Sequence, residues 1–400
     1  MDASPRTIRA RAYASRARAH SGGRRTGALR FWAAGAVALA AVVATVAGVA
    51  VTQAGAAPPS FLAQFHHVDV VGSAVPSNGD QNPYGVANVP FSTGDLVRGD
   101  TLVSNFNASN NTQGTGTTIV EVAPGGQTTL FSQIDPATLP GSCPGGVGLT
   151  TALSVLNDGY VVVGSLPVTN DGSGTPEAGC LIVLNSQGVP VETYAGNGIN
   201  GPWDMTAQQV FGPFAQLFVT NVLNGTVNAA GNEVDQGTVV RLSVFDPPGR
   251  PPTFFSSNVI ATGFAEELNS SALVLGPTGV ALGQNGTLYV ADTVKSRIAV
   301  VPAATSRFFP AFGGGLTLSR GGGLNAPLGL ATAPNGDLIA VNGNDGNAVE
   351  VTPFGAQVDT MTIDPFNSGG DLFGLAIAPN GHGVLFVDDN GSANTLDLLH

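Results

Sequence analysis

Positive charge is scarce through most of this 400-residue sequence, which contains a single lysine, Lys295. Eight of its fifteen basic residues and one of its twenty-seven acidic residues lie in residues 1–57. The rest of the chain therefore holds seven basic and twenty-six acidic residues, a formal charge of −19. Nucleic acids and anionic membranes bind clustered Lys and Arg, so this composition argues against both as partners of the folded part.

Cysteine is equally scarce, and Cys143 and Cys180 are the only two. Structural zinc needs a set of four Cys or His ligands, and no histidine lies near either cysteine in the sequence. An isolated pair in an oxidising compartment is typical of a disulfide. We therefore predict one bridge between Cys143 and Cys180.

One long uncharged apolar run, residues 31–51, follows an Arg-rich segment and precedes the small residues 54–57. This order is typical of an export signal. The run, at about 20 residues, is also long enough to cross a bilayer as a retained anchor. In either case we expect residues 1–57 to be a basic leader with a signal peptide or membrane anchor. We expect residues 58–400 to fold outside the cytoplasm.

The remaining sequence lacks an apolar stripe of helical period, which argues against a helical protein. Short β-type runs between Gly, Pro and Asn take its place, and three of them are copies of one unit. The copies read PTGVALGQNGTLYVAD from Pro277, PLGLATAPNGDLIAVN from Pro327 and LFGLAIAPNGHGVLFVDD from Leu372. Each has an Asn-Gly pair between two apolar runs, which predicts a β-hairpin with a tight turn.

Weaker copies of the unit begin at Asn82, near Leu153 and at Gly201, which makes six in residues 58–400. A period of about 40 to 60 residues with four strands in each unit is typical of propeller blades. The sixth copy has only enough chain for three strands. We therefore predict an all-β, six-bladed β-propeller in which the N-terminal segment 65–71 supplies the outer strand of the last blade and removes its free edge.

The pattern Pro-x-Gly, a turn at Asn-Gly and a strand ending in Val-Ala-Asp resembles the NHL repeat, most closely in residues 277–292. In rhythm the chain is also similar to gluconolactonase and strictosidine-synthase-like propellers. The resemblance implies six blades. Some members of these families bind proteins or polysaccharides, and others are metal-dependent lactonases or lyases, so the resemblance predicts a fold rather than an activity.

Polar residues recur where the second strand of each unit ends, and we expect them to gather toward one mouth of the central channel. They include Asn105, Asn221, Asn342, Asp292 and Asp389. Side chains of this kind commonly cap their own loops by bonding backbone N–H groups. The alternative is a cation site, with Asp292 and Asp389 as ligands and Ca²⁺ as the ion, since oxygen donors suit calcium. The resembling lactonases use Glu, Asn and Asp around a channel metal, but no Glu stands at an equivalent strand here.

Three aromatic residues, Tyr84, Trp203 and Phe373, each lie at the start of the first strand of a unit. They are expected either to line the same mouth, where they would stack on a sugar or peptide, or to pack between blades as core.

Taken together, the sequence favours an exported or cell-surface propeller, expected to be a monomer, that binds an extracellular protein, glycan, cell-wall component or small molecule. A membrane would be contacted only through residues 31–51, if they are not cleaved. The alternative function is a metal-dependent lactonase, hydrolase or lyase with its site at the channel mouth. Neither the ligand nor a reaction follows from these residues.

Overall fold

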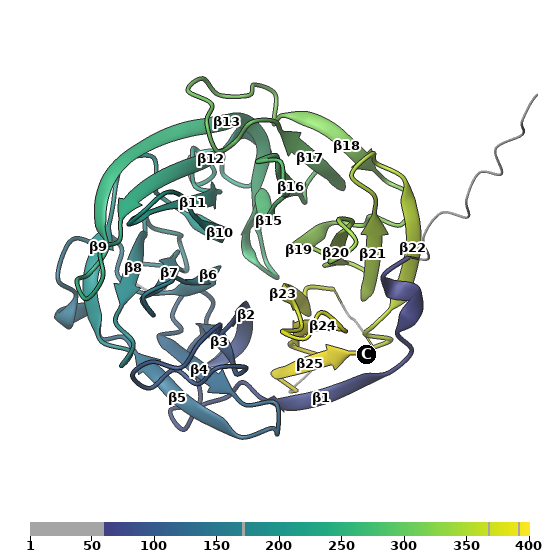
Figure 1. Cartoon of the computed structure of the whole chain (residues 1–400). Helices are drawn as coiled ribbons and strands as arrows, with labels where there is room; N and C mark the ends of the chain where they lie inside the picture. The colour runs from purple at the N-terminus through teal and green to yellow at the C-terminus, as the bar shows by residue number, and fades with distance from the viewer. Residues whose placement is uncertain (1–59, 170–172, 367–368, 391–392) are drawn as a thin grey trace, which may run out of the picture. The chain divides into compact units, whose positions relative to one another are not determined.

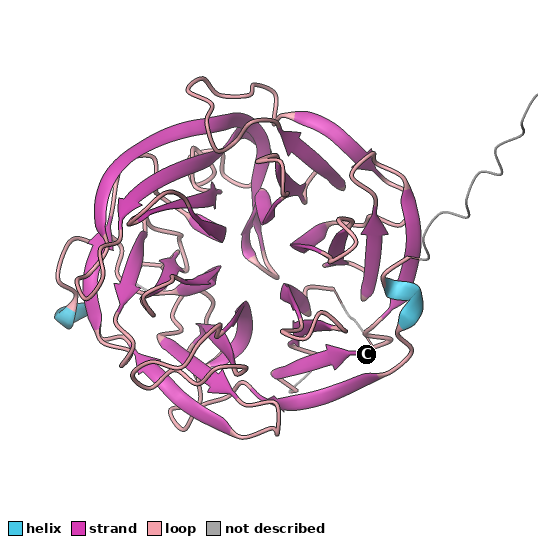
Figure 2. Ribbon diagram, in the orientation of Figure 1, coloured by secondary structure: helices cyan, strands magenta, loops and turns pink. Residues whose placement is uncertain are grey.

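The computed structural model describes residues 60–169, 173–366, 369–390 and 393–400. The leader, predicted over residues 1–57, lies outside the described residues. Within them the chain forms six antiparallel sheets arranged in a ring, as Figure 1 shows. Strand dominates, and the only helices of the described part are two short 3₁₀ turns, η1 (Leu62–Gln64) and η2 (Pro136–Thr138) (Figure 2). The predicted all-β six-bladed propeller is confirmed.

The first three blades are consecutive in the chain, and in each the inner strand comes first. Blade 1 consists of β2 (Gln81–Asn88), β3 (Thr101–Asn107), β4 (Thr118–Val122) and β5 (Thr128–Gln133). Blade 2 consists of β6 (Leu149–Val155), β7 (Val161–Ser165), β8 (Cys180–Leu184) and β9 (Pro190–Tyr194). Blade 3 has a fifth strand and consists of β10 (Pro202–Gln209), β11 (Phe214–Asn221), β12 (Val234–Phe245), β13 (Thr253–Asn269) and β14 (Leu273–Leu275).

The last three blades contain the strongest sequence repeats. Blade 4 consists of β15 (Pro277–Leu282), β16 (Leu288–Asp292), β17 (Arg297–Val301) and β18 (Leu316–Arg320). Blade 5 consists of β19 (Pro327–Thr332), β20 (Leu338–Asn342), β21 (Asn347–Val351) and β22 (Gln357–Thr362). Blade 6 consists of β23 (Leu372–Ile377), β24 (Val384–Asp388), β25 (Thr395–Leu399) and, from the other end of the chain, β1 (Val68–Ser73).

The ring is closed by β1, which pairs antiparallel with β25 from Val68 opposite Leu399 to Ser73 opposite Thr395. The backbone N–H groups of His66 and His67 also donate to the carbonyl of His400. The predicted closing role of the N-terminal segment is therefore confirmed. This pairing covers the edge of β25 and makes β1 the outermost strand of blade 6.

The core lies between neighbouring blades, because each sheet presents a row of Val, Leu and Ile to the sheet beside it. Separate apolar clusters of the described residues fill the contacts between successive blades. A further cluster joins blades 6 and 1 and extends to the axis of the ring. Packing between blades therefore fixes the positions of the six inner strands, which surround the axis of the ring.

Candidate functional site

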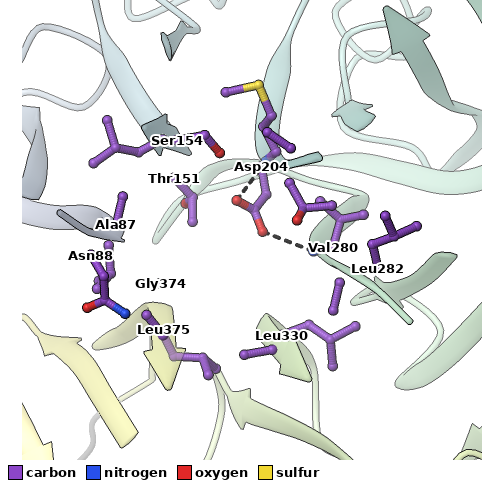
Figure 3. Close-up of a pocket in the computed structure, with 18 of the residues that line it drawn as sticks. Ala87, Asn88, Thr151, Ser154, Asp204, Val280, Leu282, Leu330, Gly374 and Leu375 are labelled. Atoms are coloured by element: carbon purple, nitrogen blue, oxygen red, sulfur yellow. Dashed lines mark hydrogen bonds between the residues drawn. The ribbon is translucent and has the colours of Figure 1, made fainter. Parts of the chain in front are cut away.

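A cavity of about 430 Å³ lies on the axis of the ring, lined by residues of all six inner strands (Figure 3). Its wall combines apolar side chains with hydroxyl and amide groups, namely Asn88, Thr151, Ser154, Thr206 and Thr332. Among the described residues that line it, Asp204 alone carries an ionisable side chain. The cavity is therefore a polar pocket with one titratable group.

Asp204 lies near the start of β10, and its carboxyl points into the cavity in Figure 3. Oδ1 accepts a hydrogen bond from the backbone N–H of Met205 at 2.7 Å. Oδ2 accepts one at 2.9 Å from the N–H of Val280, on the inner strand of the next blade. Burial raises the pKa of Asp204 to about 7, although the two N–H donors favour the ionised form and oppose the increase. A carboxyl of this pKa can accept or donate a proton near neutral pH.

The position of Asp204 in the repeat explains why it is unusual. The corresponding residue of blades 1, 4, 5 and 6 is a glycine. In three of them an added Cβ would lie 2.3, 2.2 and 2.2 Å from a backbone carbonyl oxygen of the neighbouring blade: Gly279, Gly329 and Gly374. Those blades approach too closely for a side chain, whereas blade 3 places a carboxylate at this point and bonds it to the next blade.

The sequence predicted the start of a unit at Gly201, with Trp203 as a candidate, and Asp204 was not among the predicted site residues. The signal was nevertheless in the sequence, because a charged residue stands where the strong copies have glycine. A departure from a local rule with an evident structural cost is expected at functional sites.

The three predicted aromatic residues do meet, but as buried core. The ring centroid of Tyr84 lies 3.9 Å from that of Phe373 and 5.7 Å from that of Trp203. Each of the three side chains is at most 1% exposed. Trp203 also donates from Nε1 to the carbonyl of Val274 in β14, at 2.9 Å. The group therefore fills the axis on the side of the inner strands' N-terminal halves, and it offers no open stacking surface.

The polar residues at the strand ends are also buried, and their contacts are those of loop caps. Asn105 donates from Nδ2 to the carbonyl of Ala74 at 2.9 Å. Asn342 accepts from the backbone N–H of Asn325 and donates to the carbonyl of Gly323 at 2.7 Å. Asn221 likewise accepts from a loop N–H at 3.2 Å. None of the three lines the axial cavity.

The two aspartates considered as calcium ligands do not form a shared site. Asp292 lies in blade 4, where its Oδ2 is 2.6 Å from Nε of Arg297. Asp389 follows β24 in blade 6, and the residue opposite Leu372 in the ladder is Asp388. The predicted strand end was thus one residue too far along: the hairpin from Leu372 is one residue longer than the hairpin from Pro277, whereas Asp389 would require two. In the described part of the chain, no three His, Cys, Asp or Glu side chains are grouped so as to hold a metal ion.

Cys143 and Cys180 form a disulfide, as predicted, with their Cα atoms 5.1 Å apart. The bond ties the loop ahead of β6 to the start of β8 and indicates an oxidising compartment. The described residues contain no helix with the length and apolar character needed to span a bilayer.

Comparison with known proteins supports the fold. The NHL repeat family matches residues 275–301, which cover β15, β16 and β17. No curated protein matches the chain. The solved structure of a PQQ-bound aldose sugar dehydrogenase from Streptomyces coelicolor is 17% identical, with 83% of this chain and 97% of that one covered and a TM-score of 0.50.

Two further propellers are similar at lower scores. A gluconolactonase from Xanthomonas campestris is 12% identical, with 83% and 88% covered and a TM-score of 0.49. A virginiamycin B lyase from Staphylococcus aureus, solved with quinupristin, is 14% identical, with 83% and 88% covered and a TM-score of 0.46. The strand topology and the family match together establish a six-bladed β-propeller that carries an NHL repeat.

Proposed function

We propose that this chain is an exported binding module whose axial cavity takes a small, uncharged, hydroxyl-rich molecule such as a sugar unit of a glycan. The observation that carries the proposal is Asp204, a carboxyl placed at a glycine position of the repeat and directed into the cavity. A volume of about 430 Å³ is within the usual range of small-molecule sites.

The hydrogen-bonding capacity of the cavity suits such a ligand. A carboxylate offers about four acceptor directions, and the two backbone N–H groups occupy only two of them. The remaining directions can accept ligand hydroxyls, while Thr151, Ser154 and Asn88 add donors and acceptors around the wall. A strongly charged ligand is disfavoured, because the cavity lining holds no second ionisable group in the described chain.

A second candidate is acid–base catalysis by Asp204, and the pKa of about 7 favours it. In that function the ionised carboxyl would take a proton from a water molecule that attacks a lactone or ester carbonyl. The carboxylates and histidines of the described chain do not fit a metal site, so this candidate uses no metal-bound water.

The test is calorimetric titration of a panel of neutral mono- and disaccharides into the wild-type protein and the Asp204→Asn variant. We expect one class of sugar to bind, and to bind more tightly as the pH rises from 6 to 8, because the ionised carboxyl is the better acceptor. In Asp204→Asn the affinity should fall about tenfold or more and lose this pH dependence. Asp95→Asn, which changes an exposed aspartate away from the cavity, is the control.

Absence of binding across the panel, or equal affinity in the two proteins, would contradict the binding proposal. The catalytic candidate requires hydrolysis of a lactone or ester panel, with a rate that increases through pH 7 and is lost in Asp204→Asn.

A further inference from the structure

Cationic side chains gather at one place in this acidic chain. Of the seven basic residues after residue 57, three border a single cavity of about 290 Å³ between blades 3 and 4: Lys295, Arg297 and Arg320. Blade 3 contributes Asp235, Gly263 and Ala265 to the wall, and blade 4 adds Asp292 and Gly313. This cavity shares no lining residue with the axial one, so it is a separate place on the molecule.

The strand register places three of these charges in a row. Asp292 of β16 lies directly opposite Arg297 of β17, which in turn lies directly opposite Arg320 of β18. Residues directly opposite in antiparallel strands share a sheet face, and two like charges so placed repel each other. One carboxylate beside two guanidinium groups leaves one positive charge without a counterion in this row.

The individual contacts show which of the cationic side chains has no counterion. Arg297 is fully engaged, since Nε bonds Asp292 Oδ2, Nη1 bonds Thr317 Oγ1 at 2.7 Å and Nη2 bonds the carbonyl of Gly314 at 3.0 Å. Lys295 forms an ion pair with Glu233. Arg320 is exposed and makes no side-chain hydrogen bond or ion pair with any described residue.

Asp292, which lines the same cavity, also has an unpaired acceptor atom. Asp292 is fully buried, and its Oδ1 has no hydrogen-bond partner among the described residues. A buried carboxylate oxygen without a donor costs free energy, which a ligand hydroxyl can recover. The cavity thus offers a free guanidinium and, on the same sheet face, an unsatisfied acceptor.

We infer that this cavity binds a small hydroxy-carboxylate. The ligand carboxylate pairs with the guanidinium of Arg320, whose fork matches its two oxygens, and the ligand hydroxyl donates to Asp292 Oδ1. Lys295 lies in the same wall, where its charge is paired with Glu233. Asp235 and Asp292 in the wall disfavour a doubly charged anion such as phosphate.

The experiment is ligand-observed NMR on the full-length protein with lactate, propionate and lactamide as probes. Lactate carries both groups, propionate lacks the hydroxyl and lactamide lacks the carboxylate. We expect lactate to bind at least about tenfold more tightly than either of the others, since a charge-assisted hydrogen bond is worth at least this factor. Lactate binding should weaken as the salt concentration increases.

Two variants with the same change of charge locate the site. Arg320→Gln should weaken lactate binding at least about tenfold. Arg250→Gln, which changes an exposed arginine in the β12–β13 turn, should leave binding unchanged. Because Arg320 is exposed, its variant is expected to keep the wild-type unfolding midpoint, which is measured alongside. The inference is overturned if lactate does not bind, if all three probes bind equally, or if Arg320→Gln binds lactate like the wild type.

Discussion

At the scale of single residues, the aromatic group at the axis determines how much of the channel is open. Trp203 packs against Phe373 and Tyr84, which fills the half of the axis opposite the Asp204 cavity. Its Nε1 also holds the β14 segment through Val274. The residue therefore contributes both packing and a hydrogen bond that is shielded from water.

Substitutions of Trp203 should lower the free energy of unfolding, and the larger truncation should lower it more. We expect Trp203→Ala to lower the free energy of unfolding by about 3–5 kcal/mol, because it leaves a cavity in a closed core. Trp203→Phe retains a ring and loses the indole N–H bond, so it should cost less than Trp203→Ala does. Urea denaturation followed by circular dichroism measures both. If Trp203→Ala unfolded at the wild-type midpoint, the aromatic group at the axis would not contribute to the stability of the core.

The same residues show what sequence can predict at this scale. The repeat predicted that Tyr84, Trp203 and Phe373 would converge, because equivalent positions in a propeller face one axis. The sequence could not predict that these side chains are buried, because their burial depends on the width of the closed ring and on the β14 segment over Trp203. Asp204 was visible as an exception to the repeat, but its contact with Val280 and its raised pKa required the neighbouring blade to be in place.

At the scale of elements, the ring depends on β1, which joins the two ends of the described chain. The strand it covers, β25, is buried along most of its length. Without β1, the edge of β25 would expose unpaired N–H and C=O groups to other chains.

Two truncations test this role. A chain that begins at residue 58 lacks only the segment predicted to be a leader and should remain a monodisperse species. A chain that begins at residue 75 also lacks η1 and β1, and we expect it to aggregate or to unfold at clearly lower temperature. Size-exclusion chromatography with light scattering and thermal unfolding compare the two. Equal behaviour of both truncations would show that β1 is dispensable.

Elements were predicted more fully than site residues. The Asn-Gly turns and apolar runs located the inner hairpins, and the shortage of chain in the last repeat predicted the closing strand. The fifth strand of blade 3 was missed because β14 has only three residues and no repeat partner. The strand end was predicted at Asp389 instead of Asp388 because the sequence does not show how many of the residues after Asn380-Gly381 belong to the turn, and a single residue changes the register of every later position.

At the scale of the whole molecule, the distribution of carboxyl groups determines how stability responds to pH. Burial, with neighbouring carboxyl groups as a smaller cause, raises the pKa of Asp388 and Asp389 to about 7 and that of Asp397 to about 6. Burial also raises the pKa of Asp204 and Glu266 to about 7. No lysine or arginine of the described residues belongs to blade 6, where the three aspartates Asp388, Asp389 and Asp397 lie.

The sign of the effect follows from proton binding. In the unfolded chain these groups titrate near pH 4, so between about pH 4 and 7 the folded state holds more protons than the unfolded state. The free energy of unfolding therefore falls as the pH rises through this window, because the folded protein must ionise buried carboxyls. We expect the thermal midpoint to be higher at pH 5 than at pH 8 at constant ionic strength.

A double variant separates blade 6 from the general charge of the chain. Asp388→Asn with Asp389→Asn should raise the midpoint at pH 8 and narrow the difference between pH 8 and pH 5, since two ionisations are removed. Asp95→Asn removes one negative charge from an exposed position and should leave that difference nearly unchanged. Two outcomes would contradict this prediction: a protein more stable at pH 8 than at pH 5, or a double variant that keeps the full difference in midpoint. In either case, other contacts in the folded state would stabilise the ionised carboxyl groups of blade 6. If instead the difference narrows only in the double variant, then the buried carboxyl groups of Asp388 and Asp389, at the end of β24 in blade 6, account for the gain of stability at acid pH.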